Sequence, residues 1–92
     1  MTDLENRADA VSAAFGTAIR DRRTTVGMTQ DQLALATGVG RRFLIDLEAG
    51  KRSCQLGRSI LVAEALGIRL VDILRQANTQ TPSTDELPSL LP

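Results

Sequence analysis

Two adjacent arginines, Arg41 and Arg42, are the residues of this 92-residue chain best suited to a specific recognition chemistry. A guanidinium group is a planar, permanently charged fork that can donate two parallel hydrogen bonds to guanine O6 and N7 or to a phosphate. The pair directly follows a glycine-containing stretch, Thr37 to Gly40, and begins a segment with helical spacing. The sequence therefore predicts two forked cations at the exposed start of a short helix.

Two short helices around this turn are predicted from local signals. Thr29 is an N-cap candidate, and Gln32 three residues later completes a capping box. Gly38 can adopt the positive φ that ends the first helix, and a second helix is predicted from residue 40 or 41 to 49, ending at Gly50. Two helices joined by a tight turn, the second headed by cations, form the outline of a helix-turn-helix.

The remaining segments predict further helices. Apolar residues recur with helical spacing over residues 10–26, with Ser12 as a possible N-cap, and again over residues 56–66. The segment 68–77 is ambiguous: its leucines have helical spacing, but IRLVDIL is rich in β-branched residues. A fifth helix is favoured there, with a short strand as the alternative. The predicted fold class is all-α, a compact bundle of about five helices.

The domain organisation follows from composition along the chain. Residues 1–9 are polar and acidic and are expected to form a flexible N-terminal arm, with a short first helical turn as the alternative. Residues 10–77 are expected to form the helix-turn-helix domain. Residues 78–92 are rich in Pro, Ser and Thr and are expected to be a disordered tail.

Composition excludes several classes of protein. With one cysteine, Cys54, and no histidine, we expect no zinc site, no internal disulfide and no familiar catalytic triad. No enzyme activity, metal or cofactor is therefore expected, and Cys54 is interpreted as an incidental small side chain, with a thiol sensor as the alternative. The acidic N-terminus and the lack of a long apolar run favour a cytoplasmic protein with no membrane segment.

The formal charge is zero overall but unevenly distributed. Residues 20–58 contain eight Arg/Lys and four Asp/Glu, a net charge of +4, whereas the rest of the chain has a net charge of −4. A basic centre with acidic flanks is compatible with a DNA-binding face and a separate face for another partner.

A resemblance to a known family rests on several motifs in order. The runs R-x-x-x-G-M-T-Q-x-x-L-A-x-x-x-G-V, L-E-x-G-K and A-L-G-I, within residues 12 to about 76, resemble the Cro/C1-type (λ-repressor-like, XRE) helix-turn-helix family. The run G-V-G-R-R-F-L-I-D-L-E-A-G-K is most similar to antitoxin repressors related to HipB, the partners of HipA-type kinase toxins. This resemblance implies a λ-repressor-like bundle and double-stranded DNA as partner. The HipB-related proteins end in a short strand that pairs across a dimer.

The family implies roles for residues around the turn. Gln30 matches a glutamine that binds a DNA phosphate, and Thr29 lies directly before it. Gly40, Arg41 and Arg42 match the turn and the first positions of the recognition helix, which point into the major groove. All five are expected to belong to the DNA-binding surface.

Further positions leave alternatives open. Asp46 could accept a hydrogen bond from a cytosine amino group, or pair with Arg42 at i,i+4. Ile45 could contact a thymine methyl group or belong partly to the core. Lys51 and Arg52 are placed for phosphates flanking the half-site, with a solvated loop as the alternative.

Arg23 and Glu48 match a family ion pair between the first and third helices. Such a pair would fix the recognition helix without contacting DNA.

Three functions remain in competition. The leading one is a transcriptional repressor that binds a palindromic operator as a homodimer through the recognition helix 41–49. The alternative is an antitoxin that also binds and neutralises a HipA-like kinase toxin and represses its own operon. A helix-turn-helix used only as a protein-interaction scaffold is disfavoured by Arg41 and Arg42.

Overall fold

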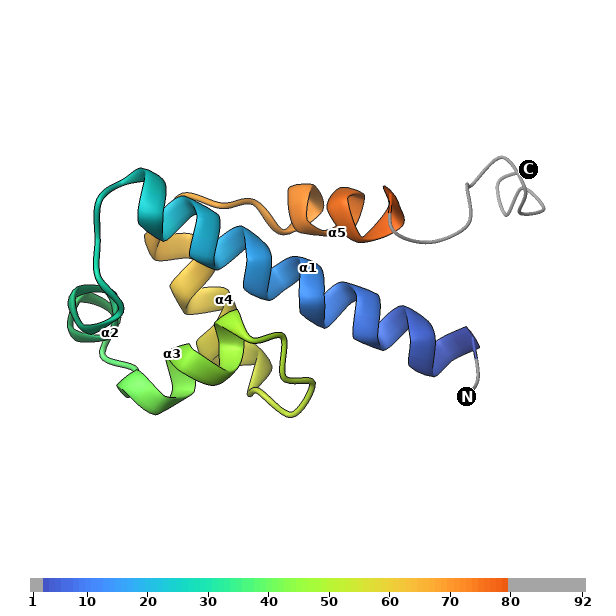
Figure 1. Cartoon of the computed structure of the whole chain (residues 1–92), viewed down its shortest axis with the longest axis horizontal. Helices are drawn as coiled ribbons and strands as arrows, with labels where there is room; N and C mark the ends of the chain where they lie inside the picture. The colour runs from blue at the N-terminus through green and yellow to red at the C-terminus, as the bar shows by residue number, and fades with distance from the viewer. Residues whose placement is uncertain (1–2, 80–92) are drawn as a thin grey trace.

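The computed structural model describes residues 3–79, and these form five helices (Figure 1). They are α1 (Asp3–Thr25), α2 (Gln30–Thr37), α3 (Arg41–Glu48), α4 (Leu56–Ala65) and α5 (Leu70–Thr79). The long α1 contacts α3 and α5, and α2 contacts α3 and α4. Figure 1 shows α5 running back alongside α1, while α2, α3 and α4 gather on the other side of α1. The all-α prediction is confirmed, and residues 3–79 contain no strand.

The helix-turn-helix forms from the local signals predicted for it. The Thr29 hydroxyl oxygen accepts from the Gln32 backbone N–H at 3.1 Å, and the Gln32 Oε1 accepts from the Thr29 N–H at 2.8 Å. Gly38 has a φ of 77° and ends α2, with its N–H donating to the Ala34 carbonyl at 2.9 Å. Gly40 is the extended residue before α3. The capping box and the glycine turn together fix the relative direction of α2 and α3.

Aliphatic side chains from all five helices form the core. Among the most deeply buried are Ile19, Leu33, Leu44, Val62 and Ile73. Burying one such side chain stabilises the fold by roughly 1.5–3 kcal/mol. Because α3 contributes Leu44 and Leu47 to this core, its opposite side is left for solvent.

The end of α3 lies unusually close to the middle of α1. A Cβ atom on Gly16 would stand 2.5 Å from the Leu47 carbonyl oxygen and 2.8 Å from the Glu48 carbonyl oxygen. Gly50, with a φ of 79°, brings the following turn within the same contact, since its own Cβ would be 3.2 Å from the Ala13 Cα. Glycines at these positions therefore set how closely α3 approaches α1.

Of the two alternatives for the N-terminal segment, residues 3–9 are helical and form the first turns of α1, so Ser12 is not the N-cap. Asp3 and Glu5 lie in the first turn, where their negative charges interact favourably with the positive end of the helix dipole and stabilise the helix. The segment is also rich in helix-forming residues. At the other end α5 continues to Thr79, so residues 78–79 are helical, contrary to the predicted tail. The remainder of that tail lies outside the described residues.

The ambiguous segment is a helix, so the alternative of a dimerisation strand is wrong. Ile73 and Ala77, one helical turn apart, are buried, which favours a helical over an alternating pattern. The strand-paired dimer of the HipB-related proteins therefore does not carry over to this segment. None of the helices within residues 3–79 is both long and apolar enough to cross a membrane.

Candidate nucleic-acid interface

Four cations lie at the two ends of α3. Arg41 and Arg42 begin the helix, and Lys51 and Arg52 follow its last turn. All four side chains are exposed, Arg42 most of all at 81%. Gly40 directly precedes the arginines. Because it has no side chain and the space beside it is open, a ligand can approach the backbone at this end of the helix closely.

Asp46 lies between two of these cations. Its carboxylate is 3.2 Å from Arg42 Nη2, at i,i+4, and 3.6 Å from Lys51 Nζ. Asp46 is 20% exposed, far less than either cation. Of the two alternatives for Asp46, the structure shows the i,i+4 pair with Arg42; contact with cytosine stays a prediction.

The other two cations pair with other helices. Arg41 Nε lies 3.1 Å from Asp31 Oδ1 in the first turn of α2, and Arg52 Nε lies 3.1 Å from Asp9 Oδ1 in α1. The sequence reasoning missed both aspartates as partners. From the sequence, Asp31 could be identified only as an acid in the first turn of α2. Its contact with Arg41 depends on the angle between α2 and α3, which no local sequence pattern predicts.

A buried network ties the start of α2 and the end of α3 to α1. Arg23 donates to Glu48 through Nε–Oε2 at 2.7 Å and Nη2–Oε1 at 3.0 Å, and its Nη1 donates to the Met28 carbonyl at 2.9 Å. The Arg23 and Glu48 side chains are 13% and 5% exposed. The hydrogen bond to Glu48 raises the pKa of Arg23 above its ordinary value, more than burial lowers it. The structure brings together the two residues that the family resemblance pairs.

Gln30 joins this network. Its Nε2 donates to Glu48 Oε1 at 3.2 Å, and its side chain is half-buried. An amide nitrogen carries two N–H bonds, so one remains for a phosphate. An open groove lies beside Gln30, and the half-buried Ile45 also lines it. Ile45 is thus partly shielded from solvent, and its membership of the core is not shown by its contacts in this groove.

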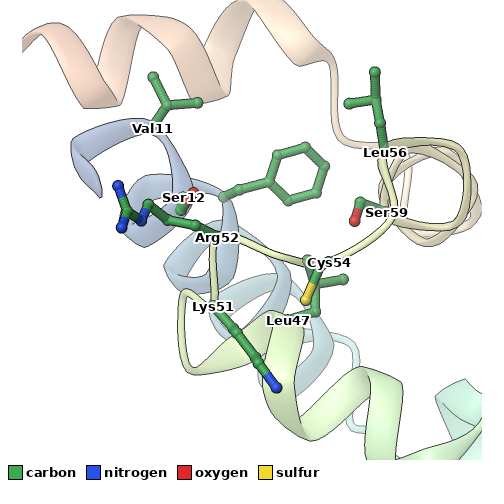
Figure 2. Close-up of a pocket in the computed structure, with 9 residues that line it drawn as sticks. Val11, Ser12, Leu47, Lys51, Arg52, Cys54, Leu56 and Ser59 are labelled. Carbon is green, nitrogen blue, oxygen red and sulfur yellow. The ribbon is translucent and has the colours of Figure 1, made fainter. Parts of the chain in front are cut away.

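A small pocket lies on another side of α3 (Figure 2). It has a volume of ≈ 150 Å³ and is lined mainly by apolar residues of α1, α3 and α4, including Val11, Phe15, Leu47 and Leu56. In Figure 2 the Lys51 side chain extends away from Val11 and Leu56. Apolar contact, rather than charge, dominates this pocket.

Cys54 also lines the pocket and is half-buried. Burial is the main cause that raises the pKa of its thiol, and the charge of Asp46 adds to it, while Lys51 lowers it. The thiol is therefore the form favoured at neutral pH. No group of three or more Cys, Asp and Glu residues able to hold a metal ion occurs within residues 3–79.

Comparison with known proteins gives consistent matches. The helix-turn-helix family profile matches residues 19–73. An uncharacterized HTH-type transcriptional regulator of Sinorhizobium fredii is 44% identical over 62 residues, covering 67% of this chain and 80% of that protein. Another from Methanothermobacter thermautotrophicus is 43% identical over 51 residues, covering 55% of this chain and 74% of that protein. A third, from Archaeoglobus fulgidus, is 37% identical over 57 residues, covering 62% and 81%.

No solved structure gives a significant match. The profile nonetheless spans more than half of the chain, from the last turns of α1 to the first turn of α5, and so contains the complete α2–turn–α3 unit. This chain belongs to the helix-turn-helix family, in its Cro/C1 type.

Proposed function

We propose that this protein is a transcriptional repressor that binds a palindromic operator as a homodimer, with α3 in the major groove. The observation that carries the proposal is the placement of Arg41 and Arg42. Both lie exposed at the N-terminal end of a helix whose other end is fixed by the buried Arg23–Glu48 pair. A rigidly held helix with exposed forked donors is the arrangement that base recognition requires.

The surrounding residues would bind the DNA backbone. Gln30, with one N–H left for a phosphate, lies at the start of α2, and Lys51 and Arg52 lie beyond the other end of α3. Thr29 and Gly40 are the N-cap residues of α2 and α3, and their backbone would form part of the same DNA-binding surface. Phosphate contacts set the register of the protein on DNA without selecting a sequence.

Two further residues of α3, Ile45 and Asp46, would have separate roles. Ile45, which lines the groove beside Gln30, would contact a thymine methyl group. Asp46 would hold Arg42 and Lys51 in place, as it does in the free protein.

A homodimer is proposed because one small domain recognises few base pairs. Two half-sites about 34–36 Å apart, one turn of B-DNA, would supply the required specificity. Exposed apolar side chains on α5, namely Leu70, Val71 and Leu74, support a subunit contact through that helix.

The test is selection from fragmented genomic DNA by the purified protein, followed by sequencing. We expect enrichment of an inverted repeat, binding that weakens steeply with added salt, and repression of a reporter placed behind the selected sequence. Light scattering of the complex should give the mass of the operator duplex plus the mass of two protein chains. Enrichment no greater than in the input DNA, at low salt, would reject the proposal.

An antitoxin role is the second candidate, in the cytoplasm with a HipA-like kinase as partner. The observation that favours it is a set of leucines exposed away from the core: Leu35 on α2 and Leu56 and Leu61 on α4, at 86%, 69% and 54%. Exposed leucines of this kind are suited to a protein partner. Co-expression with a kinase encoded beside this gene tests the role: rescue of growth and co-purification are expected, and continued toxicity would exclude that kinase as the partner.

A further inference from the structure

The ion pair between Asp31 and Arg41 crosses the turn of the helix-turn-helix. Asp31 is the second residue of α2 and Arg41 is the first residue of α3. The contact joins Arg41 Nε to Asp31 Oδ1 at 3.1 Å, and the two side chains are 62% and 71% exposed. An exposed pair of this kind changes folding stability little, so any consequence lies in what Arg41 can bind.

The atom that Arg41 uses is informative. The closest approach of Asp31 is to its Nε, at the opposite side of the guanidinium from the edge that joins Nη1 and Nη2. That terminal edge can donate two parallel hydrogen bonds to guanine O6 and N7. The alternative bidentate edge, Nε with Nη2, contains the atom that lies nearest the aspartate.

Arg42 differs from Arg41 in this respect. Asp46 contacts its Nη2, one of the two terminal nitrogens, at 3.2 Å. Because Nη2 carries two N–H bonds, Asp46 takes only part of the donor capacity of that terminal edge, whereas the closest approach of Asp31 to Arg41 is at Nε.

We infer that Asp31 is a specificity-determining residue, which positions Arg41 for guanine and keeps that arginine from binding phosphates indiscriminately. The inference rests on the proposed DNA-binding function and deepens it. The Asp31 carboxylate stays beside Arg41 in the complex, where its charge repels phosphates approaching the side of the fork. The pair thus lowers affinity for any DNA while leaving the guanine-binding edge available.

The variant that tests this is Asp31→Asn, which removes the charge with little change in shape. Dissociation constants would be measured for the selected operator and for a scrambled duplex, each over a series of salt concentrations. Because a good bidentate contact discriminates by about tenfold or more, we expect the ratio of the two affinities to fall about tenfold. Arg41 becomes free to bind phosphate, so the slope of log K against log salt on the scrambled duplex should steepen by about 0.9.

Two companion variants separate this role from a structural one. Asp31→Glu keeps the charge and should restore most of the discrimination. Glu64→Gln removes one negative charge from an exposed position on α4, and no ion pair to Glu64 is found within residues 3–79. It should leave the affinity ratio unchanged. Loss of the first-turn charge of α2 alone would lower the urea midpoint without altering the salt slope.

The outcomes are distinct. If Asp31→Asn matches Glu64→Gln in affinity ratio and in salt slope, the inference is overturned while the proposed function stands. If the wild-type protein itself prefers no sequence, the proposed function and the inference fail together.

Discussion

The Arg23 guanidinium and the Glu48 carboxylate form a bidentate pair, with Nε–Oε2 at 2.7 Å and Nη2–Oε1 at 3.0 Å, almost fully shielded from solvent. Arg23 belongs to α1 and Glu48 is the last residue of α3. The pair therefore fixes the end of α3 against α1. Through Gln30, the same carboxylate also positions the start of α2.

Replacing Glu48 by Ala should destabilise the fold by about 3–5 kcal/mol, because Arg23 would keep a buried charge without its partner. Urea unfolding, with the transition slope checked for two-state behaviour, gives the measurement. The matched control is Arg69→Ala, which breaks the exposed pair with Asp72 and should cost less than about 1 kcal/mol. Equal losses in the two variants would show that burial of the Arg23–Glu48 pair contributes nothing.

Gly16→Ala should destabilise the protein by about 1–3 kcal/mol, because the new methyl group meets the Leu47 and Glu48 carbonyls and forces α1 and α3 apart. Thermal and urea unfolding measure the loss. Gly57→Ala is the control: nothing lies within 4 Å of its Cβ position, and alanine in α4 should stabilise by about 0.5–1 kcal/mol. A Gly16→Ala protein as stable as wild type would contradict the close approach of the two helices.

The sequence predicted the elements whose signals are local. The capping box at Thr29 and the glycine at Gly38 located α2 and the turn to within a residue. The start of α1 is harder to predict, because residues 3–9 lack apolar residues at helical spacing, although their acids and good helix formers favour a helix.

The candidate site was predictable where the residue type alone suggested the chemistry, as at Arg41 and Arg42. The carboxylates Asp31 and Asp9 were missed because they meet their arginines only after the helices pack. Gly16 had a usable signal, since a glycine inside an otherwise regular helix costs about 1 kcal/mol and so suggests a close contact. The contact that needs it could not be named from the sequence.

Thr29→Ala should lower stability by about 1 kcal/mol, since it removes the side-chain acceptor of the α2 capping box. Thr29→Asn supplies another acceptor and should retain most of the stability. Comparing both variants by urea unfolding isolates the cap. If asparagine is as damaging as alanine, the hydroxyl has a role other than capping.

The Cys54 thiol should react slowly. Burial raises its pKa, so the folded protein holds less thiolate at a given pH than the unfolded chain does, and the thiolate is the reactive form. The rate of alkylation by iodoacetamide should be several-fold lower in buffer than in urea at pH 8. Its rise with pH should be displaced to higher pH in the folded protein. Equal rates in both states would contradict the raised pKa.

We propose that α3 recognises DNA through its first two residues, Arg41 and Arg42. The most direct measurement is the affinity of Arg41→Ala and Arg42→Ala for the selected operator and for its single-base variants, with folding verified by urea unfolding. We predict that Arg41→Ala weakens operator binding by about 5- to 150-fold and relaxes the preference at one base pair. Arg42→Ala should also weaken binding. If both folded variants keep wild-type affinity and sequence preference, α3 is not the recognition helix.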